Sequence, residues 1–312
     1  MSEIVKTEYQ QSNLKFIDEV NLLMQGTLDL HVHAGPSLIP RRLDPVEAAK
    51  QAAEAGLKAI LVKDHHWPLV REVYFIKKYV FQNGIDVDIL SGVALNRSIG
   101  GINPHAVEAA LDFGARMVWL PTISSRNHIE YHKKKLGISF PSTEKHLLEE
   151  KPIYLLDNKG NLPDELNVIM EQVRDADAVL SMGHVSVPEI FAVLDRARDM
   201  GLRRLVVNHP TFIIQATDND IMEFVEKGAF IEFSACMTDR RSKFYFIPAI
   251  ELKRLLLVGG LDSVFIGSDL GQHDTPPPVE GLMVVADALL AEGMKMGELR
   301  HIFQDNPQKI VY

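Results

Sequence analysis

The stretch Leu28-Asp29-Leu30-His31-Val32-His33-Ala34-Gly35 closes a short apolar run with two histidines that are one residue apart. In a β-strand, the side chains at positions i and i+2 lie on the same side, so His31 and His33 can reach one metal ion together. Imidazole is a suitable ligand for Zn, Mn and Fe. The stretch therefore predicts a strand that ends in part of a metal site.

Three more residues of metal-binding type stand at the ends of later apolar runs. His184 follows residues 178–183, His209 follows residues 205–208, and Asp269 follows residues 264–268. A single histidine at a strand end is more often structural, hydrogen-bonded to a neighbouring carbonyl. Five such residues at four strand ends favour a metal site, provided that the fold brings these ends together.

Eight apolar runs of strand length alternate with amphipathic stretches of helical periodicity. The predicted strands cover residues 27–31, 59–63, 87–93, 116–120, 178–182, 205–208, 230–234 and 263–267. One helix start is clear at Asp44-Pro45-Val46-Glu47, with Asp as N-cap, Pro at the first helical position and Glu at the third. The repeat of strand, helix, glycine and strand predicts parallel βα units.

The placement of polar residues decides between two arrangements of these units. A doubly wound open sheet concentrates its site at one switch point, whereas a (β/α)8 barrel places polar residues after many strands. Here polar residues follow many strands, so we expect a (β/α)8 TIM barrel and a single domain over residues 1–312. We interpret residues 121–173, between strands four and five, as an insertion.

That insertion contains a basic patch, His132-Lys133-Lys134-Lys135, then Pro141, and the stretch Tyr154-Leu155-Leu156-Asp157-Asn158-Lys159-Gly160, which is typical of a strand and a turn. We expect a hairpin or a lid over the active-site face, since a long loop inside a compact domain is usually functional.

Composition narrows the class of protein. The chain has 312 residues, 46% hydrophobic and 24% charged, with a net charge of −9, which argues against nucleic acid or an anionic membrane as the main partner. The single cysteine, Cys236, excludes an internal disulfide framework and a cysteine-based zinc site. Residues 1–11 lack the apolar core of a signal peptide, and no apolar run is long enough to span a bilayer. We expect a cytoplasmic protein that acts on a small-molecule substrate.

Lys63 ends the second predicted strand, where burial disfavours its charge. Three interpretations remain open: a carbamylated lysine that bridges two metals, a cation that holds an anionic substrate, or an ion pair with Asp64 or Asp29. His65 follows closely and is a candidate for substrate contact.

Arginines that follow strands indicate an anionic substrate as a set, although each one alone is more often a surface residue. They are Arg41, Arg42, Arg97, Arg126, Arg240 and Arg241. We select Arg97, Arg126 and the nearby His128, together with His65, as candidate substrate contacts.

The ordered pattern of His-x-His after strand one, His after strands five and six, and Asp after strand eight resembles the amidohydrolase superfamily. The matching residues are His31, His33, His184, His209 and Asp269. Asn306-Pro307-Gln308-Lys309 is similar to the ending of many such enzymes, and residues 101–110 look like the DUF6282 type of metal-hydrolase-like proteins. The resemblance covers residues 27–312.

The resemblance implies a barrel with one or two divalent metals, zinc first and Mn or Fe as alternatives. It implies His31, His33 and Asp269 at the first ion and His184 and His209 at the second. Strand four, however, lacks the bridging Lys or Glu of the two-metal members, so Lys63 is a candidate for a carbamylated bridge. A single ion held by His31, His33, His184 and Asp269 is the alternative, with His209 as a catalytic group. Self-association to a homo-oligomer is also compatible with the resemblance.

These features predict a metal-dependent hydrolase that uses metal-activated water to cleave an amide, cyclic amide, lactone or phosphoester bond of a small anionic substrate. Asp269 serves as general base and then as acid to the leaving group. The alternative is a mononuclear decarboxylase of an unsaturated or aromatic acid. A binding or regulatory protein with a vestigial metal site is the third hypothesis.

Overall fold

Eight parallel strands form one sheet whose spatial order is the same as their order in the sequence. The computed structural model describes residues 14–80, 84–136 and 148–312. The strands are β1 (Leu28–His33), β2 (Ala59–Lys63), β3 (Asp88–Ala94), β4 (Met117–Trp119), β5 (Val179–Ser181), β6 (Leu205–Asn208), β7 (Ala229–Ser234) and β8 (Val264–Gly267). All eight predicted strands are therefore confirmed.

The sheet closes where β1 meets the segment that follows β8. The backbone N–H of Asp269 donates to the carbonyl of His31 over 2.8 Å, and the N–H of His33 donates to the carbonyl of Leu270 over 2.8 Å. This seam confirms the predicted (β/α)8 barrel and excludes the open sheet.

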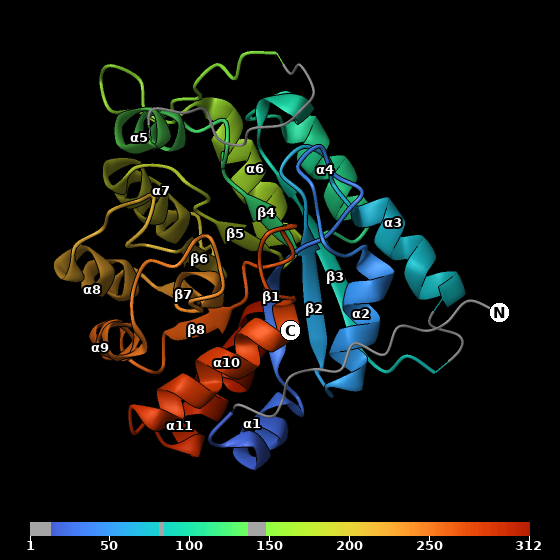
Figure 1. The fold of residues 1–312 in the computed structure, drawn as a ribbon. Helices are drawn as coiled ribbons and strands as arrows, with labels where there is room; N and C mark the ends of the chain where they lie inside the picture. Colours follow the sequence, from blue (N-terminus) through green and yellow to red (C-terminus); the bar gives the residue numbers. More distant parts are fainter. Residues whose placement is uncertain (1–13, 81–83, 137–147) are drawn as a thin grey trace.

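Helices surround the strands as an outer layer (Figure 1). They are α1 (Ile17–Met24), α2 (Pro45–Glu54), α3 (Val70–Phe75), α4 (Pro104–Asp112), α5 (Arg126–Leu136), α6 (Asp164–Asp175), α7 (Val187–Asp199), α8 (Asp218–Glu226), α9 (Ala249–Gly259), α10 (Pro278–Ala291), α11 (Met296–Arg300) and α12 (Asn306–Val311). The predicted start of α2 is confirmed, because Asp44 accepts from the N–H of Glu47 and Glu47 accepts from the N–H of Asp44. None of the described helices combines the length and the apolarity needed to cross a lipid bilayer. Residues 1–11, on which the signal-peptide expectation falls, lie outside the described residues.

The interior of the barrel is a packed apolar core, so the site can form only at its mouth. Leu28, Leu61, Trp119 and Phe265 are fully buried there, together with Ile310 from α12. A second apolar layer fills the space between the strands and the helices.

An irregularity in β1 turns its two histidines toward the mouth. The pairing register of β1 with β2 shifts between Asp29 and Val32. Leu30 belongs to the interior core and Val32 to the outer layer, yet His31 and His33 both line the mouth. The carboxylate of Asp29 accepts from the N–H of His31 over 3.2 Å, which holds this bulge. The prediction that His31 and His33 share one side is confirmed.

The interval 121–173 differs from the predicted hairpin. Its described residues contain α5 and α6, and α6 packs beside α4 in the outer layer. Of the strand and turn predicted at residues 154–160, the strand is wrong and the turn is confirmed. Ile153 makes only an isolated bridge with Ser125, and Asp157 caps the turn by accepting from the N–H groups of Lys159 and Asn161. Short polar side chains favour such turns over strands. Pro141 and the side chain of Lys135 lie outside the described part of the chain.

Gly271 permits the close approach on which the seam depends. Its φ is 113°, and a Cβ at this position would lie 1.8 Å from the carbonyl oxygen of His33. We expect Gly271→Ala to lower the free energy of unfolding by about 1–3 kcal/mol, since it adds both backbone strain and a clash. Urea denaturation measures this change.

Gly297 in α11 is the matched control, because a Cβ there meets no atom within 4 Å. Gly297→Ala should leave stability unchanged or raise it by up to ~1 kcal/mol. Equal stabilities for the two variants would contradict the account of the seam.

Candidate metal centre

A cavity at the carboxyl ends of the strands gathers all five predicted metal ligands. Its described lining consists of His31, His33, Ile39, Arg41, His65, His128, His132, His184, His209, Phe212, Ile213, Cys236, Met237, Phe244, Asp269 and Gln272. His31 and Asp269 are far apart in the chain, yet β1 lies beside β8, as expected when strand ends meet at the mouth of a barrel.

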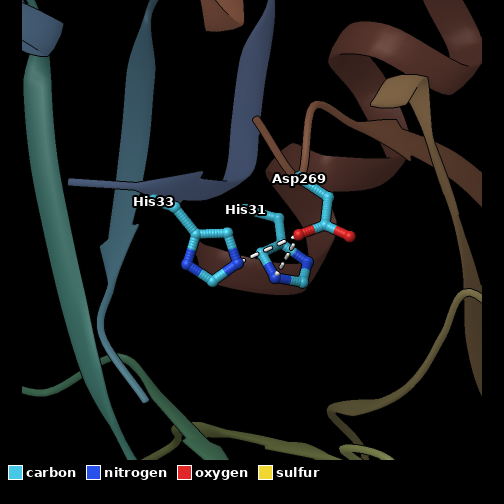
Figure 2. Close-up of side chains that lie close together, drawn as sticks. All are labelled: His31, His33 and Asp269. Atoms are coloured by element: carbon cyan, nitrogen blue, oxygen red, sulfur yellow. Dashed lines mark hydrogen bonds and ion pairs between the residues drawn. The ribbon is translucent and has the colours of Figure 1, made fainter. Parts of the chain in front are cut away.

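The first group consists of His31, His33 and Asp269 (Figure 2). Asp269 Oδ1 lies 3.3 Å from His31 Nε2 and 3.0 Å from His33 Nε2. The candidate ligand atoms of the three residues all lie within 4.8 Å of one another. Asp269 has a positive φ of 49°, a conformation that aspartate tolerates better than most residues. Three side chains that can bind a metal thus meet at the seam between β1 and the segment that follows β8.

The second group consists of His184 and His209. Their Nε2 atoms are 3.1 Å apart, and His209 Nδ1 lies 3.6 Å from Asp269 Oδ2. Ser234 Oγ contacts the same Nδ1 over 3.1 Å. The carboxylate of Asp269 therefore stands between the two groups, with one oxygen directed at each.

Protonation states in the cavity suit a metal. Burial lowers the pKa of His33 and of His184 well below the ordinary histidine value, and it lowers the pKa of His209 to about 4. Burial alone raises the pKa of Asp269, but the charges of the surrounding histidines and the hydrogen bond from His33 outweigh it and hold this pKa well below its usual range. Neutral imidazoles and an ionised carboxylate are the forms that bind divalent ions, so this donor set fits a metal.

Glu232 is a functional residue that the sequence analysis missed. It is fully buried on β7, and its Oε1 lies 2.6 Å from His31 Nδ1. Its other oxygen accepts from the side-chain amide of Asn208, whose oxygen accepts from the hydroxyl of Ser181. This contact places the proton of His31 on Nδ1 and leaves Nε2 for a metal. A glutamate in the middle of the apolar run 230–234 was the available signal, because charged residues are rarely fully buried without a partner.

Glu232 could also bind a metal itself, because its candidate ligand atom and those of His31 and His209 lie within 4.8 Å of one another. Because its Oε1 lies 2.6 Å from His31 Nδ1, the nitrogen that faces away from Asp269, we assign Glu232 to orienting that ring. Carboxylates commonly hold the far nitrogen of a metal-binding histidine.

Lys63 reaches across the barrel from β2 toward the end of β4. Its Nζ lies 3.1 Å from His31 Nε2 and 4.9 Å from the centre of the Trp119 ring. Burial lowers the pKa of this amine to about 8. In the described part of the chain, neither Asp64 nor Asp29 forms an ion pair with Lys63, so the ion-pair interpretation is not supported. Nζ instead lies between His31 and the ring of Trp119, the last residue of β4.

The predicted substrate contacts divide into two pairs. His65 and His128 line the cavity; His65 Nδ1 lies 2.9 Å from Thr122 Oγ1, and His128 Nδ1 lies 2.8 Å from His184 Nδ1. Arg97 and Arg126 are not among the described lining residues.

Arg97 and Arg126 instead contact residues of α5 and of the segment that follows it. Arg97 donates to the carbonyls of Lys151 and Pro152 over 2.6 Å and 3.2 Å. Arg126 lies 3.9 Å from Glu130 and 5.4 Å from the centre of the Tyr154 ring. Neither contact directs a guanidinium into the cavity.

The chain matches a known family. The model of a family described as "Family of unknown function (DUF6282)" matches residues 26–232, which is more than half of the chain. No protein with a curated description matches it. The chain belongs to the DUF6282 family, which confirms the resemblance noted at residues 101–110.

Solved structures share the fold over most of their length. An amidohydrolase from Pseudomonas aeruginosa has a TM-score of 0.61 at 12% identity, covering 94% of this chain and 98% of that one. A β-aspartyl dipeptidase from Fervidobacterium islandicum has 0.57 at 14%, covering 92% and 72%. A 2,6-dihydroxybenzoate decarboxylase from Rhizobium has 0.56 at 11%, covering 92% and 98%. At these identities the likeness shows a common fold, which supports the resemblance to the amidohydrolase superfamily.

Metal content gives the first test of the site. We expect the purified protein to hold one or two divalent ions per chain and the His31→Ala/His33→Ala variant to lose them, because it lacks both histidines of the first group. Elemental analysis after dialysis measures the ratio. His105→Ala, an exposed histidine on α4, should keep the wild-type content. A wild-type protein that takes up neither Zn nor Mn would refute the metal site.

Orientation of His31 gives the second test. We expect Glu232→Gln to weaken metal affinity about 10- to 100-fold, since an amide holds the His31 ring less firmly than a carboxylate does. Competition with a coloured chelator measures the affinity. Glu171→Gln, exposed on α6, should have no effect. Unchanged affinity in Glu232→Gln would show that this carboxylate does not support the ligand.

Proposed function

We propose that this member of the DUF6282 family is a metal-dependent hydrolase that cleaves an amide, cyclic amide, lactone or phosphoester bond of a small anionic substrate. The observation that carries the proposal is the position of Asp269, whose two oxygens are directed at two groups of buried histidines. Both groups line one cavity at the mouth of the barrel, which is where enzymes with this fold bind small molecules.

The proposed ligands follow from the two groups of the cavity. His31, His33 and Asp269 hold the first ion, and His184 and His209 hold the second, with Lys63 as a carbamylated bridge. If one ion is present, His184 joins the first group and His209 is left to polarise the substrate. When bound, zinc, or Mn or Fe in its place, lowers the pKa of water and polarises the carbonyl or phosphoryl oxygen of the substrate.

The side chains of the cavity supply the remaining chemistry. Asp269 is ionised, so it can take a proton from the attacking water and return it to the leaving group. Ser234 holds His209 through Nδ1, so the Nε2 of that ring is directed at His184. His65 and His128 are positioned for polar contact with a substrate. Phe212 and Met237 add apolar surface to the lining of the cavity.

Decarboxylation of an aromatic or unsaturated acid is the second candidate. It is favoured by the end of β4, where Trp119 stands and neither a lysine nor a glutamate bridges two ions. A decarboxylase also occurs among the solved structures with this fold.

Replacement of the central carboxylate tests the mechanism. We expect Asp269→Asn to lower kcat/KM by about 10²- to 10⁴-fold, because the amide accepts no proton, while the melting temperature stays close to that of the wild type. The assay uses the best substrate from a panel of amides, lactones and phosphoesters. Asp274→Asn changes an exposed carboxylate on the same loop and should keep full activity. Full activity in Asp269→Asn would eliminate the proposed general base.

The products distinguish the two candidate reactions. Hydrolysis in H₂¹⁸O places one labelled oxygen in an organic product, whereas decarboxylation of an aromatic acid releases carbon dioxide and leaves an organic product that gains no oxygen. Mass spectrometry reads both outcomes. Carbon dioxide release without hydrolysis of any panel member would replace the hydrolase proposal by the decarboxylase.

A further inference from the structure

One wall of the cavity carries an arginine that has no hydrogen-bonded partner. Arg41 lies on the segment after β1, lines the cavity, and its side chain is only 3% exposed. No described residue accepts a hydrogen bond from its Nε or its Nη2. Burial lowers its pKa to about 10, so the guanidinium still carries its charge at neutral pH.

Asp64 forms a long ion pair with Arg41, but the hydrogen bonds of this carboxylate go to other groups. Its Oδ2 lies 3.9 Å from Arg41 Nη2, beyond hydrogen-bond distance. Oδ1 accepts from the N–H groups of His66 and Trp67 over 2.8 Å and 3.1 Å, and Oδ2 accepts from the hydroxyl of Ser37. Asp64 therefore holds the loop after β2 and leaves the donors of Arg41 unsatisfied.

The backbone fixes Arg41 in this position. Arg41 forms an antiparallel bridge with Gln272, and the N–H of Arg42 donates to the carbonyl of Gly271 over 2.8 Å. A Cβ at Gly35 would lie 3.2 Å from the Cβ of Arg41, so the arginine stem packs closely on the backbone there. The guanidinium is thus preorganised at the cavity wall.

A buried guanidinium without hydrogen bonds is costly, and its planar fork matches a carboxylate. Of the described residues that line the cavity, Arg41 alone carries a permanent positive charge. Phe212, Ile213 and Met237 supply an apolar surface in the same cavity. We infer that Arg41 binds a carboxylate of the substrate, separate from the bond that is cleaved, while the apolar body of the substrate lies on this surface.

This inference rests on the proposed function, since it names the substrate class of the same cavity: small carboxylic acids with an apolar body. It differs from the sequence prediction, which assigned substrate contact to Arg97 and Arg126. Those two guanidinium groups lie at the segment around α5 and are not among the described residues that line the cavity.

Isothermal titration calorimetry of the metal-loaded protein with benzoate tests the inference. We expect benzoate to bind, Arg41→Gln to weaken its affinity about 10- to 100-fold, and Arg41→Lys to give an intermediate loss, because lysine keeps the charge without the fork. Arg42→Gln is the matched control: this neighbouring arginine is exposed and donates to the carbonyl of His273, so the affinity should be unchanged.

Three outcomes would overturn the inference. They are the absence of benzoate binding at millimolar concentration, equal affinities for the wild type and Arg41→Gln, and loss of binding only in His31→Ala/His33→Ala, which would place the carboxylate on the metal. A folding defect is separable, because the melting temperature of unliganded Arg41→Gln, measured beside that of the wild type, reports any loss of structure independently of benzoate binding. Calorimetry needs no turnover, so an inactive protein that binds benzoate through Arg41 would contradict the hydrolase proposal alone.

Discussion

The carboxylate of Asp29 accepts two backbone N–H groups, from His31 within β1 and from Ser268 at the segment that follows β8. The first bond holds the bulge that turns His31 into the mouth beside His33. The second fixes the segment that carries Asp269. One buried side chain therefore sets both the direction of the first two histidines and the position of the carboxylate that faces them. The closure of the barrel and the assembly of the site depend on the same constraint, which is why the cavity lies at this seam.

His31 is the residue through which the two sides of the site interact. Its Nδ1 contacts Glu232, and its Nε2 faces Asp269 and the amine of Lys63. Hydrogen bonds continue from Glu232 through Asn208 to Ser181. Residues of β1, β5, β6 and β7 are therefore linked to the imidazole ring of His31. Such a network is stabilising only when every member is satisfied. The cavity thus combines a rigid base of hydrogen-bonded groups with an apolar wall formed by the loops.

The sequence predicted the barrel and the five convergent residues because both depend on strand ends, which apolar runs mark clearly. Glu232 was missed because it lies within a run, where only burial reveals its role. The arginines show a different difficulty. Arg97 and Arg126 follow strands as Arg41 does, but the direction of a loop depends on its distant partners. Arg41 enters the cavity because its backbone pairs with Gln272, more than two hundred residues away. Helix α6 was not predicted, because residues 121–173 were interpreted as an insertion with a strand at 154–160. That stretch forms a turn, and α6 is one of the helices that connect β4 to β5.

The seam between β1 and the segment after β8 also has a consequence for the order of folding. His33 and Asp269 are separated by 236 positions in the chain, so their contact is among the last that a growing polypeptide can make. During synthesis the histidines of β1 are present long before the carboxylate that completes their group. An ion that binds across the seam stabilises the closed ring over any opened form by mass action. The proposed metal would therefore stabilise the closure of the barrel as well as take part in the reaction, and its removal should loosen the protein first at the junction of β1 and β8.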